Sequence, residues 1–536
     1  MGTISLIDYG VVALYLVATL IIGMYVGAYV QTGKEFFLAG RTLPWWAIGF
    51  SLVATDIGGT DVVGVGGAAY HYGIAVSNFE WIGCVPAMIV AAFVFIPHFW
   101  RCGVTTIPEY LERRFNVGVR TAVAVCWVAF MACNLGVMLL ASAKLMAALA
   151  GWPFLMTILL VVVMVLFYTW SGGLAAVVYT DVLQGSVMVF GCLLAAAIGV
   201  WQCGGIVPLK QQVERSLAVQ QASRQSASIE PTERKPLRNE HFSLVLPVDT
   251  PSPYPWPGIL FGLAFIISPS YWIGNQAIVQ RALGARSEYE AKASYVWGAL
   301  LKNVIPFAIV IPGLIALARF PDLSDPDQAL PKVIGSMMPP GMKGIFLAAF
   351  LAALMSSVDS YLNSAATIVA NDFYLRFVRP NADERRMLQI GRLVTIVIMM
   401  WGVGFALWFQ NSQSGIYTVF QTLMSFFNGP ALAVLLAGLL TKQATGRGAL
   451  IGFVGGVATS VTLYLLNHDV VITAFRWQPL FQIENPFLYC SIWSFAMTVL
   501  LTTIVSYASA AEPPEKQRYA LGGRFDIEPQ AGGATA

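Results

Sequence analysis

The stretch SLVATDIGGTDVVG, from Ser51 to Gly64, interrupts a hydrophobic run that is otherwise long enough to cross a bilayer. A second interrupted run reads IISPSYWIGNQ, from Ile266 to Gln276. In both, glycine, proline and small polar residues stand where a helix would favour leucine or alanine. Unpaired backbone groups are costly in lipid, so a broken helix persists there only where it lines a cavity or contacts a ligand. Two such breaks in corresponding halves of a chain indicate a transporter binding site.

Composition places the whole chain in the membrane. Its 536 residues are 57% hydrophobic and only 11% charged, whereas soluble domains carry about 25% charged residues. Apolar runs recur along almost the entire length, which predicts an all-α polytopic membrane protein. No basic, aromatic-interleaved patch supports nucleic-acid binding, and no GxxxxGK[ST] motif supports ATP as the energy source. The seven cysteines form no CxxC pair and are expected to be small buried hydrophobes.

The hydrophobic pattern predicts about thirteen transmembrane helices. The first run lacks a basic n-region and carries Asp8 at its start, so it is expected to be a retained helix rather than a cleaved signal. Spans of about 30 residues must tilt, kink or extend beyond the bilayer. The predicted spans are 7–29, 45–70, 76–99, 118–150, 153–171, 174–201, 256–282, 287–319, 342–374, 384–410, 415–441, 446–466 and 486–510.

Charge in the short loops predicts the orientation. One alternate set of loops is rich in Lys and Arg and is expected to be cytoplasmic. An odd number of spans then puts the N-terminus outside and the C-terminus inside a cell (plasma) membrane. The basic set comprises Lys34, Arg41, Arg101, Arg113, Arg114, Arg120, Arg281, Arg286, Arg376, Arg379, Arg385, Arg386, Lys442 and Arg447. The long loop 203–255 falls outside, and its Gln, Ser, Arg and Pro content predicts partial disorder.

A cation site is predicted where the ninth span faces the first break. Ala353, Ser356 and Ser357 lie at i, i+3 and i+4 and share one helix face. Their hydroxyl and carbonyl oxygens suit a small hard cation. One helix cannot supply the roughly five oxygens that sodium needs, and the carbonyls of Ala54 and Ile57, freed just before the glycine pair, would supply the rest. Alternatively, the two serines back-bond to their own helix or pack against a neighbour.

Ionisable residues inside predicted spans are candidates for function, because burying a charge in lipid is costly. They are Asp56, Asp61, Glu80, Asp181, Lys302 and Asp359. Pairing of Lys302 with one of the acids for purely structural reasons is the alternative. Structural pairing and solute binding are compatible, since sugar hydroxyls can bridge separated charges.

Polar and aromatic side chains gather near the second break and predict a solute site. Amides both donate and accept hydrogen bonds, which suits hydroxyl-rich ligands, and aromatic faces cover sugar rings or close a site. For Trp272 and Tyr271 simple packing is the alternative. The group comprises Ser268, Tyr271, Trp272, Asn275, Gln276 and the later Gln421.

Several motifs in order resemble the sodium/solute symporter family, most closely its sodium/glucose cotransporter branch. The resemblance covers roughly residues 5 to 465. The motifs are FFLAGR before the second span, TIPEYLERRF (Thr106 to Phe115), SGGLAAVVYTDVLQ (Ser171 to Gln184), NQAIVQRALGA (Asn275 to Ala285), and the segment from Ser356–Ser357 to Asn371–Tyr374.

The resemblance implies a LeuT-type inverted-repeat bundle. Its implied parts are an extra helix and loop (1–44), a first five-helix repeat (45–202), the long loop (203–255), a second repeat (256–441), two further helices (442–510) and a tail (511–536). It also implies Na⁺ as the coupling ion, held by Ala54, Ile57, Ala353, Ser356 and Ser357, with Asp181 on the inner sodium route.

The solute-binding positions carry over unevenly from the resemblance. Glu80, Asn134, Lys302 and Gln421 match the sugar branch by type, and Tyr271 matches its inner-gate tyrosine. Three positions depart from the characterised bacterial sugar carrier: Asp61 replaces a glutamine, Ser268 an asparagine, and Phe79 a tyrosine. The extra carboxylate at Asp61 favours an amine-bearing or polyol solute, or proton coupling, over plain glucose or galactose.

The expected function is therefore sodium-coupled symport of a small polar solute, most simply a sugar or polyol, by alternating access, and not an enzymatic reaction. The alternatives are sodium- or proton-coupled symport of an amino acid, organic acid or nucleoside, and a transporter-like sensor or passive channel. The expected partners are the solute, sodium and the lipid bilayer, with a monomer sufficient for transport. The eight positions expected to contact the solute are Asp61, Glu80, Asn134, Ser268, Tyr271, Asn275, Lys302 and Gln421.

Overall fold

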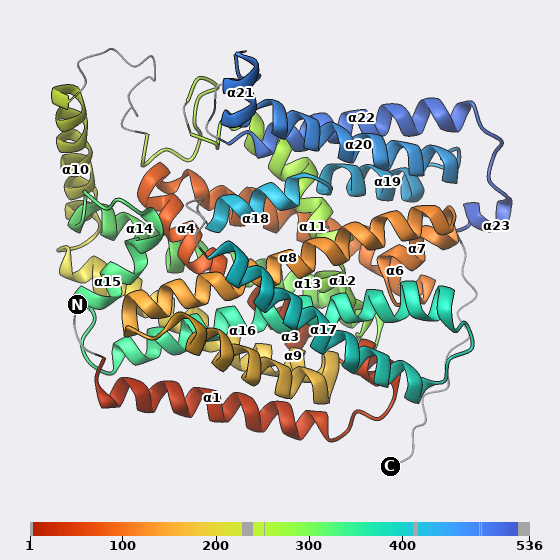
Figure 1. Cartoon of the computed structure of the whole chain (residues 1–536), viewed down its shortest axis with the longest axis horizontal. Helices are drawn as coiled ribbons and strands as arrows, with labels where there is room; N and C mark the ends of the chain where they lie inside the picture. The colour runs from red at the N-terminus through yellow and green to blue at the C-terminus, as the bar shows by residue number, and fades with distance from the viewer. Residues whose placement is uncertain are drawn as a thin grey trace.

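The computed structural model describes residues 4–227, 240–250, 252–410, 416–476, 478–481, 483 and 485–523, and the regular elements in these ranges are all helical. Two isolated β-bridges join Leu43 to Ala285 and Leu246 to Pro255. Most of the long helices run side by side along the longest axis of the molecule (Figure 1). The all-α prediction is confirmed over the part of the chain that is described.

The helices up to residue 227 are α1 (Leu6–Gly27), α2 (Gly33–Leu38), η1 (Ala39–Arg41), α3 (Trp45–Asp56), α4 (Gly59–Tyr72), η2 (Gly73–Ser77), η3 (Phe79–Cys84), α5 (Val85–Val90), η4 (Ala91–Phe95), α6 (Ile96–Cys102), α7 (Ile107–Arg114), α8 (Val117–Ala150), α9 (Phe154–Gln202) and α10 (Ile206–Ala227). Capping side chains fix several of the starts: Thr106 accepts a hydrogen bond from the Glu109 amide, and Asn116 accepts one from the Val119 amide.

The later helices are η5 (Gly258–Ile267), α11 (Ser268–Gly274), α12 (Gln276–Leu283), α13 (Glu288–Lys302), α14 (Ile305–Arg319), η6 (Pro326–Gln328), α15 (Ala329–Met337), α16 (Met342–Ile368), η7 (Val369–Val378), α17 (Glu384–Phe409), α18 (Ile416–Ser425), α19 (Asn428–Leu440), α20 (Gly446–Leu466), α21 (Asp469–Phe475), α22 (Phe487–Tyr507) and α23 (Pro514–Gln517).

Both interrupted spans are broken, as the sequence predicts. The first bends by 55° between α3 and the helix that continues from residue 61, and the second bends by 50° between residues 274 and 276. Asn275 separates α11 from α12 with an extended backbone, and its side chain accepts a hydrogen bond from the Ala277 amide. The freed backbone groups at this break are thus partly satisfied within the protein, as a membrane interior requires.

The described residues contain ten helices long and apolar enough to cross a membrane, or twelve when each bent pair is one span. One of the ten, α9, has 49 residues, and at 1.5 Å per residue it is about twice as long as a bilayer is thick. Gly173 interrupts it with a non-helical backbone (φ 50°, ψ −143°). Counting α9 as two spans around Gly173 gives the thirteen that the sequence predicts, with the boundary at the expected place.

The helix that carries the predicted serines lies at the centre of the bundle. In the helix formed by α16 and its extension to Val378, 94% of the residues in the most apolar stretch are buried inside the protein. The corresponding share for α1 is 22%. α16 packs against α1, α3, α8 and α9. Asp8, near the start of α1, accepts hydrogen bonds from the Gly341 and Gly344 amides, each at 2.7 Å. A peripheral helix thus caps the start of the central one.

The long loop outside the spans is more ordered than the sequence predicts. The loop 203–255 contains helix α10, which packs on α14 (Figure 1). The sequence contains a pattern that indicates this helix: Leu209, Val213 and Leu217 are spaced four residues apart, as on one face of a helix, and all three are buried. The expected disorder fails over 206–227, and residues 228–239 lie outside the described ranges.

The tail also folds back onto the bundle. The Tyr519 carbonyl accepts a hydrogen bond from the Tyr110 hydroxyl at 2.7 Å and lies 2.9 Å from Nε2 of His98. The Leu521 amide donates to the Leu439 carbonyl at 2.8 Å. The tail therefore contacts α6, α7 and the end of α19, while residues 524–536 lie outside the described ranges.

Candidate functional site

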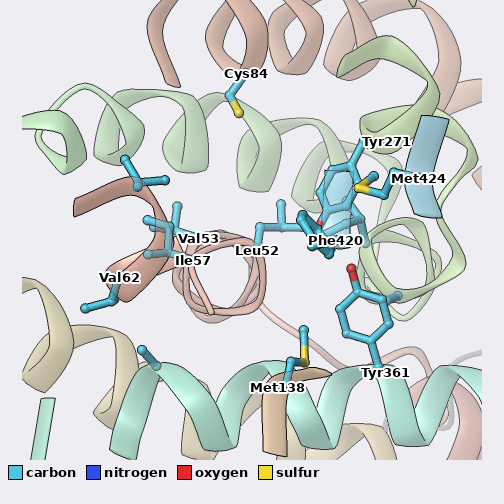
Figure 2. Packing of buried hydrophobic residues seen from close by; sticks show 14 of the residues in the cluster. Leu52, Val53, Ile57, Val62, Cys84, Met138, Tyr271, Tyr361, Phe420 and Met424 are labelled. Atoms are coloured by element: carbon cyan, nitrogen blue, oxygen red, sulfur yellow. The ribbon is translucent and has the colours of Figure 1, made fainter. Parts of the chain in front are cut away.

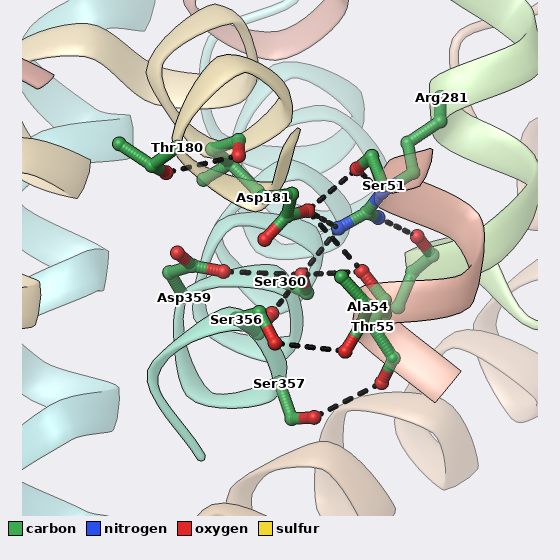
Figure 3. A network of polar contacts seen from close by, with 12 residues as sticks. Ser51, Ala54, Thr55, Thr180, Asp181, Arg281, Ser356, Ser357, Asp359 and Ser360 are labelled. Carbon is green, nitrogen blue, oxygen red and sulfur yellow. Dashed lines mark hydrogen bonds and ion pairs between the residues drawn. The ribbon is translucent and has the colours of Figure 1, made fainter. Parts of the chain in front are cut away.

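Oxygen atoms of Ala54, Ser356 and Ser357, three of the residues predicted for the cation, lie together between α3 and α16 (Figure 3). Ser356 Oγ donates to the carbonyl oxygen of Ala54 at 2.7 Å, and Ser357 Oγ donates to that of Thr55 at 3.0 Å. Both hydroxyls also lie close to the Ala353 carbonyl, at 3.1 and 3.2 Å. All five residues are buried. Each serine hydroxyl thus lies near a carbonyl of its own helix, as the alternative interpretation predicts, and also near a carbonyl at the end of α3.

Local sequence explains why α3 ends beside these serines. Ile57 leaves the helical region (φ −94°, ψ 83°) and Gly58 is extended. Asp61 accepts a hydrogen bond from the Gly58 amide at 3.0 Å, which stabilises the start of α4. A side chain at Gly59 would come within 3.1 Å of Leu354 on α16. The break is therefore built into the sequence, and a contribution from the Ile57 carbonyl to the cation site stays a prediction.

Asp181 lies next to this oxygen cluster and belongs to a buried polar network (Figure 3). Its Oδ2 accepts hydrogen bonds from Ser51 Oγ at 2.5 Å and Thr55 Oγ1 at 3.4 Å. Ser360 Oγ lies 2.9 Å from Thr55 Oγ1 and 3.1 Å from Asp359 Oδ1. The predicted carboxylate is thus one hydroxyl away from the carbonyl and serine cluster.

Arg281 completes this network. The prediction that Arg281 belongs to the basic cytoplasmic loops was wrong. It lies within α12 with a fully buried side chain. Its guanidinium donates to Ser51 Oγ at 2.6 Å and to Asp181 Oδ2 at 3.3 Å, and it also contacts Ser360 Oγ. A buried arginine next to a carboxylate is a structural or functional ion pair and carries no information about loop topology.

A second buried cluster surrounds Lys302. Its ammonium pairs with Asp56 and, at 2.6 Å, with Glu80 Oε2. It also lies 5.9 Å from the centre of the Trp272 ring. Asp56, Glu80 and Cys84 each have one candidate ligand atom within 4.8 Å of the others, and the lysine ammonium occupies the neighbourhood that a metal ion would need. The pairing of Lys302 with acids, which the sequence left open as an alternative, is present.

Other predicted solute contacts have polar atoms without a partner in the described part of the chain. Both side-chain polar atoms of Asn134 and Oε1 of Gln421 are buried and make no hydrogen bond there. Buried polar groups are normally satisfied, so such atoms are available to a polar ligand or to water. Gln421 lies on α18, which packs on α4 and α8, the helices that carry Asp61 and Asn134.

Apolar and aromatic side chains close one side of this region. Figure 2 shows Tyr271 close to Phe420 and Met424, and the hydroxyl of Tyr361 points in their direction. All four belong to one continuous buried cluster. Ser268, one turn before Tyr271, is also buried, and its Oγ would lie 2.7 Å from a Cβ added at Gly83. The structure thus places Ser268 against η3, the helix that carries Glu80.

Six polar residues of these clusters were absent from the predicted site. Asp56 and Asp359 were recognised only as intramembrane charges, and Ser51, Thr55, Ser360 and Arg281 were not assigned to a site. A signal existed for three of them, since Ser51 and Thr55, like Ser356 and Ser360, are four residues apart and share a helix face. No sequence signal joins Arg281 to Asp181 across 100 residues.

Comparison with known proteins identifies relatives along nearly the whole chain. The family described as "Sodium:solute symporter family" matches residues 36–456. The sodium/glucose cotransporter of Vibrio parahaemolyticus is 31% identical over 534 residues, covering 95% of this chain and 91% of that protein. The human sodium/myo-inositol cotransporter 2 is 31% identical over 538 residues, covering 95% of this chain and 77% of its own length.

A solved structure supports the fold independently. A Na⁺-coupled sialic acid symporter in a substrate-bound outward-open state superposes with a TM-score of 0.76, covering 95% of this chain and 99% of that one. Sequence identity to it is 22%, so the likeness is evidence for the architecture alone. The predicted LeuT-type bundle is confirmed.

Proposed function

Because this chain belongs to the sodium:solute symporter family, which makes it a transporter with sodium as its coupling ion, we propose that it imports a sugar or polyol by alternating access. The names of its relatives support this solute class, since they include glucose and myo-inositol cotransporters. The pocket chemistry supports it as well. Unpartnered amide groups and a Lys–carboxylate cluster suit a neutral, hydroxyl-rich solute that both donates and accepts hydrogen bonds.

The observation that carries the proposal is the contact of Ser356 and Ser357 with the end of α3. Sodium would bind among the carbonyls of Ala54 and Ala353 and the two serine hydroxyls, with Ile57 completing the shell. To coordinate a cation, each hydroxyl must turn its hydrogen away from the carbonyls and present a lone pair. One ion would then replace the hydrogen bonds that join the two helices, and would hold α3 against α16 more firmly than they do.

The solute would bind on the other side of the break, between Asp61, Glu80, Asn134 and Lys302, with Gln421 and Asn275 beside it. Lys302 is neutralised by Asp56 and Glu80, so it offers N–H donors without a strong net attraction for anions. Tyr271 and Ser268 lie at the second break and would meet the solute from that side. This arrangement puts both binding regions next to the discontinuous helices, as expected for such transporters.

The sodium gradient supplies enough free energy for uphill import. One positive charge moving through about 100 mV contributes about 2.3 kcal/mol. A tenfold sodium gradient adds about 1.4 kcal/mol. One ion can therefore drive an accumulation of several hundredfold for a neutral solute. We also propose that the N-terminus lies outside and the C-terminus in the cytoplasm, because the basic short loops are expected on the cytoplasmic side.

A screen of the purified protein tests the solute class. Thermal unfolding should be followed with glucose, galactose, myo-inositol, mannitol and amino acids, each with sodium and with choline as the replacement cation. We expect sodium alone to raise the unfolding midpoint and a sugar or polyol to raise it further only when sodium is present. Sodium-dependent stabilisation by amino acids alone would overturn the solute class and leave the coupling ion intact.

A second candidate is an amine-bearing solute or one that moves with a proton. Three carboxylates, Asp56, Asp61 and Glu80, lie close enough to Lys302 to interact with it electrostatically. An ammonium group on the solute would offset the excess negative charge. Uptake of glucosamine and glucose, driven separately by a sodium gradient and by a pH gradient, separates these cases.

A further inference from the structure

The network drawn in Figure 3 ties the second broken span to the proposed sodium site through one residue, Arg281. Its guanidinium contacts α3 through Ser51, α9 through Asp181 and α16 through Ser360. Within its own helix it also contacts the Ala277 carbonyl. A rigid fork of five N–H donors is suited to joining several elements at once, which a lysine ammonium does less well.

The groups that Arg281 holds are also those that shape the sodium site. Ser360 Oγ contacts the carbonyl of Ser356 and lies 2.9 Å from Thr55 Oγ1. Thr55 in turn accepts the hydrogen bond of Ser357 through its own carbonyl. A movement of α3 against α16 at the cation oxygens therefore changes the positions of the partners of Arg281.

The charges of this network give a reason why a cation at the sodium site should affect Arg281. Arg281 is permanently positive, while Asp181 and Asp359 belong to the same buried network. Taken as ionised, these three groups sum to one negative charge, and a monovalent cation between α3 and α16 brings the sum to zero. In that ionised state the network without the cation keeps an uncompensated buried charge, which is costly in a membrane interior.

We propose that Arg281 is the positioning residue that makes closure of α12 depend on sodium. With sodium bound, Thr55 and Ser360 are fixed and Arg281 holds α12 against α3 and α9. When sodium leaves, these partners shift, the guanidinium can no longer hydrogen-bond to all of them at once, and α12 is free to move away from α3 and α9. The proposal rests on the sodium site proposed above.

Hydrogen–deuterium exchange of the full-length protein tests this inference. In the wild type we expect sodium, compared with choline, to slow amide exchange in residues 276–283 by about tenfold. In Arg281→Gln the slowing should disappear, while sodium still raises the thermal unfolding midpoint. Arg281→Lys should keep part of it, because the charge remains and the fork is lost.

A matched control separates coupling from simple burial. Arg114 is also fully buried and donates to the carbonyls of Gly438 and Thr441 at 2.9 and 2.7 Å, away from the network. Arg114→Gln should lower stability and leave the sodium-dependent slowing in 276–283 unchanged. If Arg281→Gln does not fold, Ser360→Ala serves instead, and the same loss of slowing is expected.

The outcomes are distinguishable. Sodium-dependent slowing that persists in Arg281→Gln or Ser360→Ala would show that Arg281 only packs, and would overturn the inference. Loss of every sodium effect in the wild type, on exchange and on stability alike, would instead overturn the proposed sodium site on which it rests.

Discussion

Ser356 Oγ lies 2.7 Å from the carbonyl oxygen of Ala54, although 302 residues separate the two along the chain. The contact joins the central helix α16 to the end of the first half-helix of a broken span. It exists because α3 stops at Asp56 and leaves its last carbonyls without the next turn's amides. A hydroxyl from another helix satisfies such a carbonyl, and a cation can replace it at the same oxygen atoms.

Removing one of these hydroxyls should abolish sodium coupling. We expect Ser357→Ala to reduce sodium-driven uptake into proteoliposomes by at least about tenfold, because it takes one ligand from a site of about five. Sodium should also no longer raise the thermal unfolding midpoint. Ser364→Ala is the matched control, since Ser364 lies two turns further along α16, is buried, and has no partner in the described residues. Uptake by Ser357→Ala with unchanged sodium affinity would contradict the site.

Lys302 is expected to be needed for both stability and transport. Lys302→Ala leaves the buried Glu80 and the largely covered Asp56 without a counter-ion, and breaking a buried pair in this way typically costs about 3–5 kcal/mol. Neutralising both acids in the triple variant Asp56→Asn/Glu80→Gln/Lys302→Ala should recover most of the thermal stability and not the uptake. Wild-type uptake rates in the triple variant would show the cluster to be structural only.

Asp61 is expected to have two separable roles. As a hydrogen-bond acceptor it stabilises the start of α4, and losing such a cap costs about 1 kcal/mol. Asp61→Ala should therefore lower the unfolding midpoint by about one degree, whereas Asp61→Asn keeps an acceptor and should stay near the wild type. Uptake by Asp61→Asn then reports the charge alone. An equal loss of stability in both variants would argue against the capping role.

A histidine outside the spans should make stability depend on pH. Burial lowers the pKa of His241 to about 4 from its ordinary value of 6.5, and its carbonyl accepts the Ile74 amide at 2.8 Å beyond the end of α4. The folded state thus favours the neutral imidazole. Its contribution, about 3 kcal/mol, is fully present above pH 6.5 and is lost as the pH falls towards 4.

The measurement is the thermal unfolding midpoint between pH 8 and pH 4.5. The midpoint of the wild type should fall steeply below pH 6.5, and that of His241→Gln should fall less over the same range. Parallel curves would indicate that other groups carry the acid sensitivity.

The sequence predicted the parts of this protein that depend on local chemistry. Glycines and small polar residues inside apolar runs cannot continue a helix in lipid, so the breaks near residues 57 and 275 were readable in advance. The spacing of Ala353, Ser356 and Ser357 likewise fixes their common face, because 3.6 residues make one turn. The hydrophobic pattern also located the division of α9 at Gly173, where a single helix would be too long for the bilayer.

Only the tertiary structure decided which distant groups meet. The predicted span 256–282 includes Arg281, but nothing in the local pattern pairs it with Asp181. Nor does it show that Lys302 is shared between Asp56 and Glu80, or that Thr55 and Ser360 extend the serine cluster. The reason is physical: a buried charge is stable only with its partner in place, and the partner is set by how helices from both halves of the chain pack. The sequence thus determined where the helices break, and their packing decided which charges and oxygens the breaks bring together.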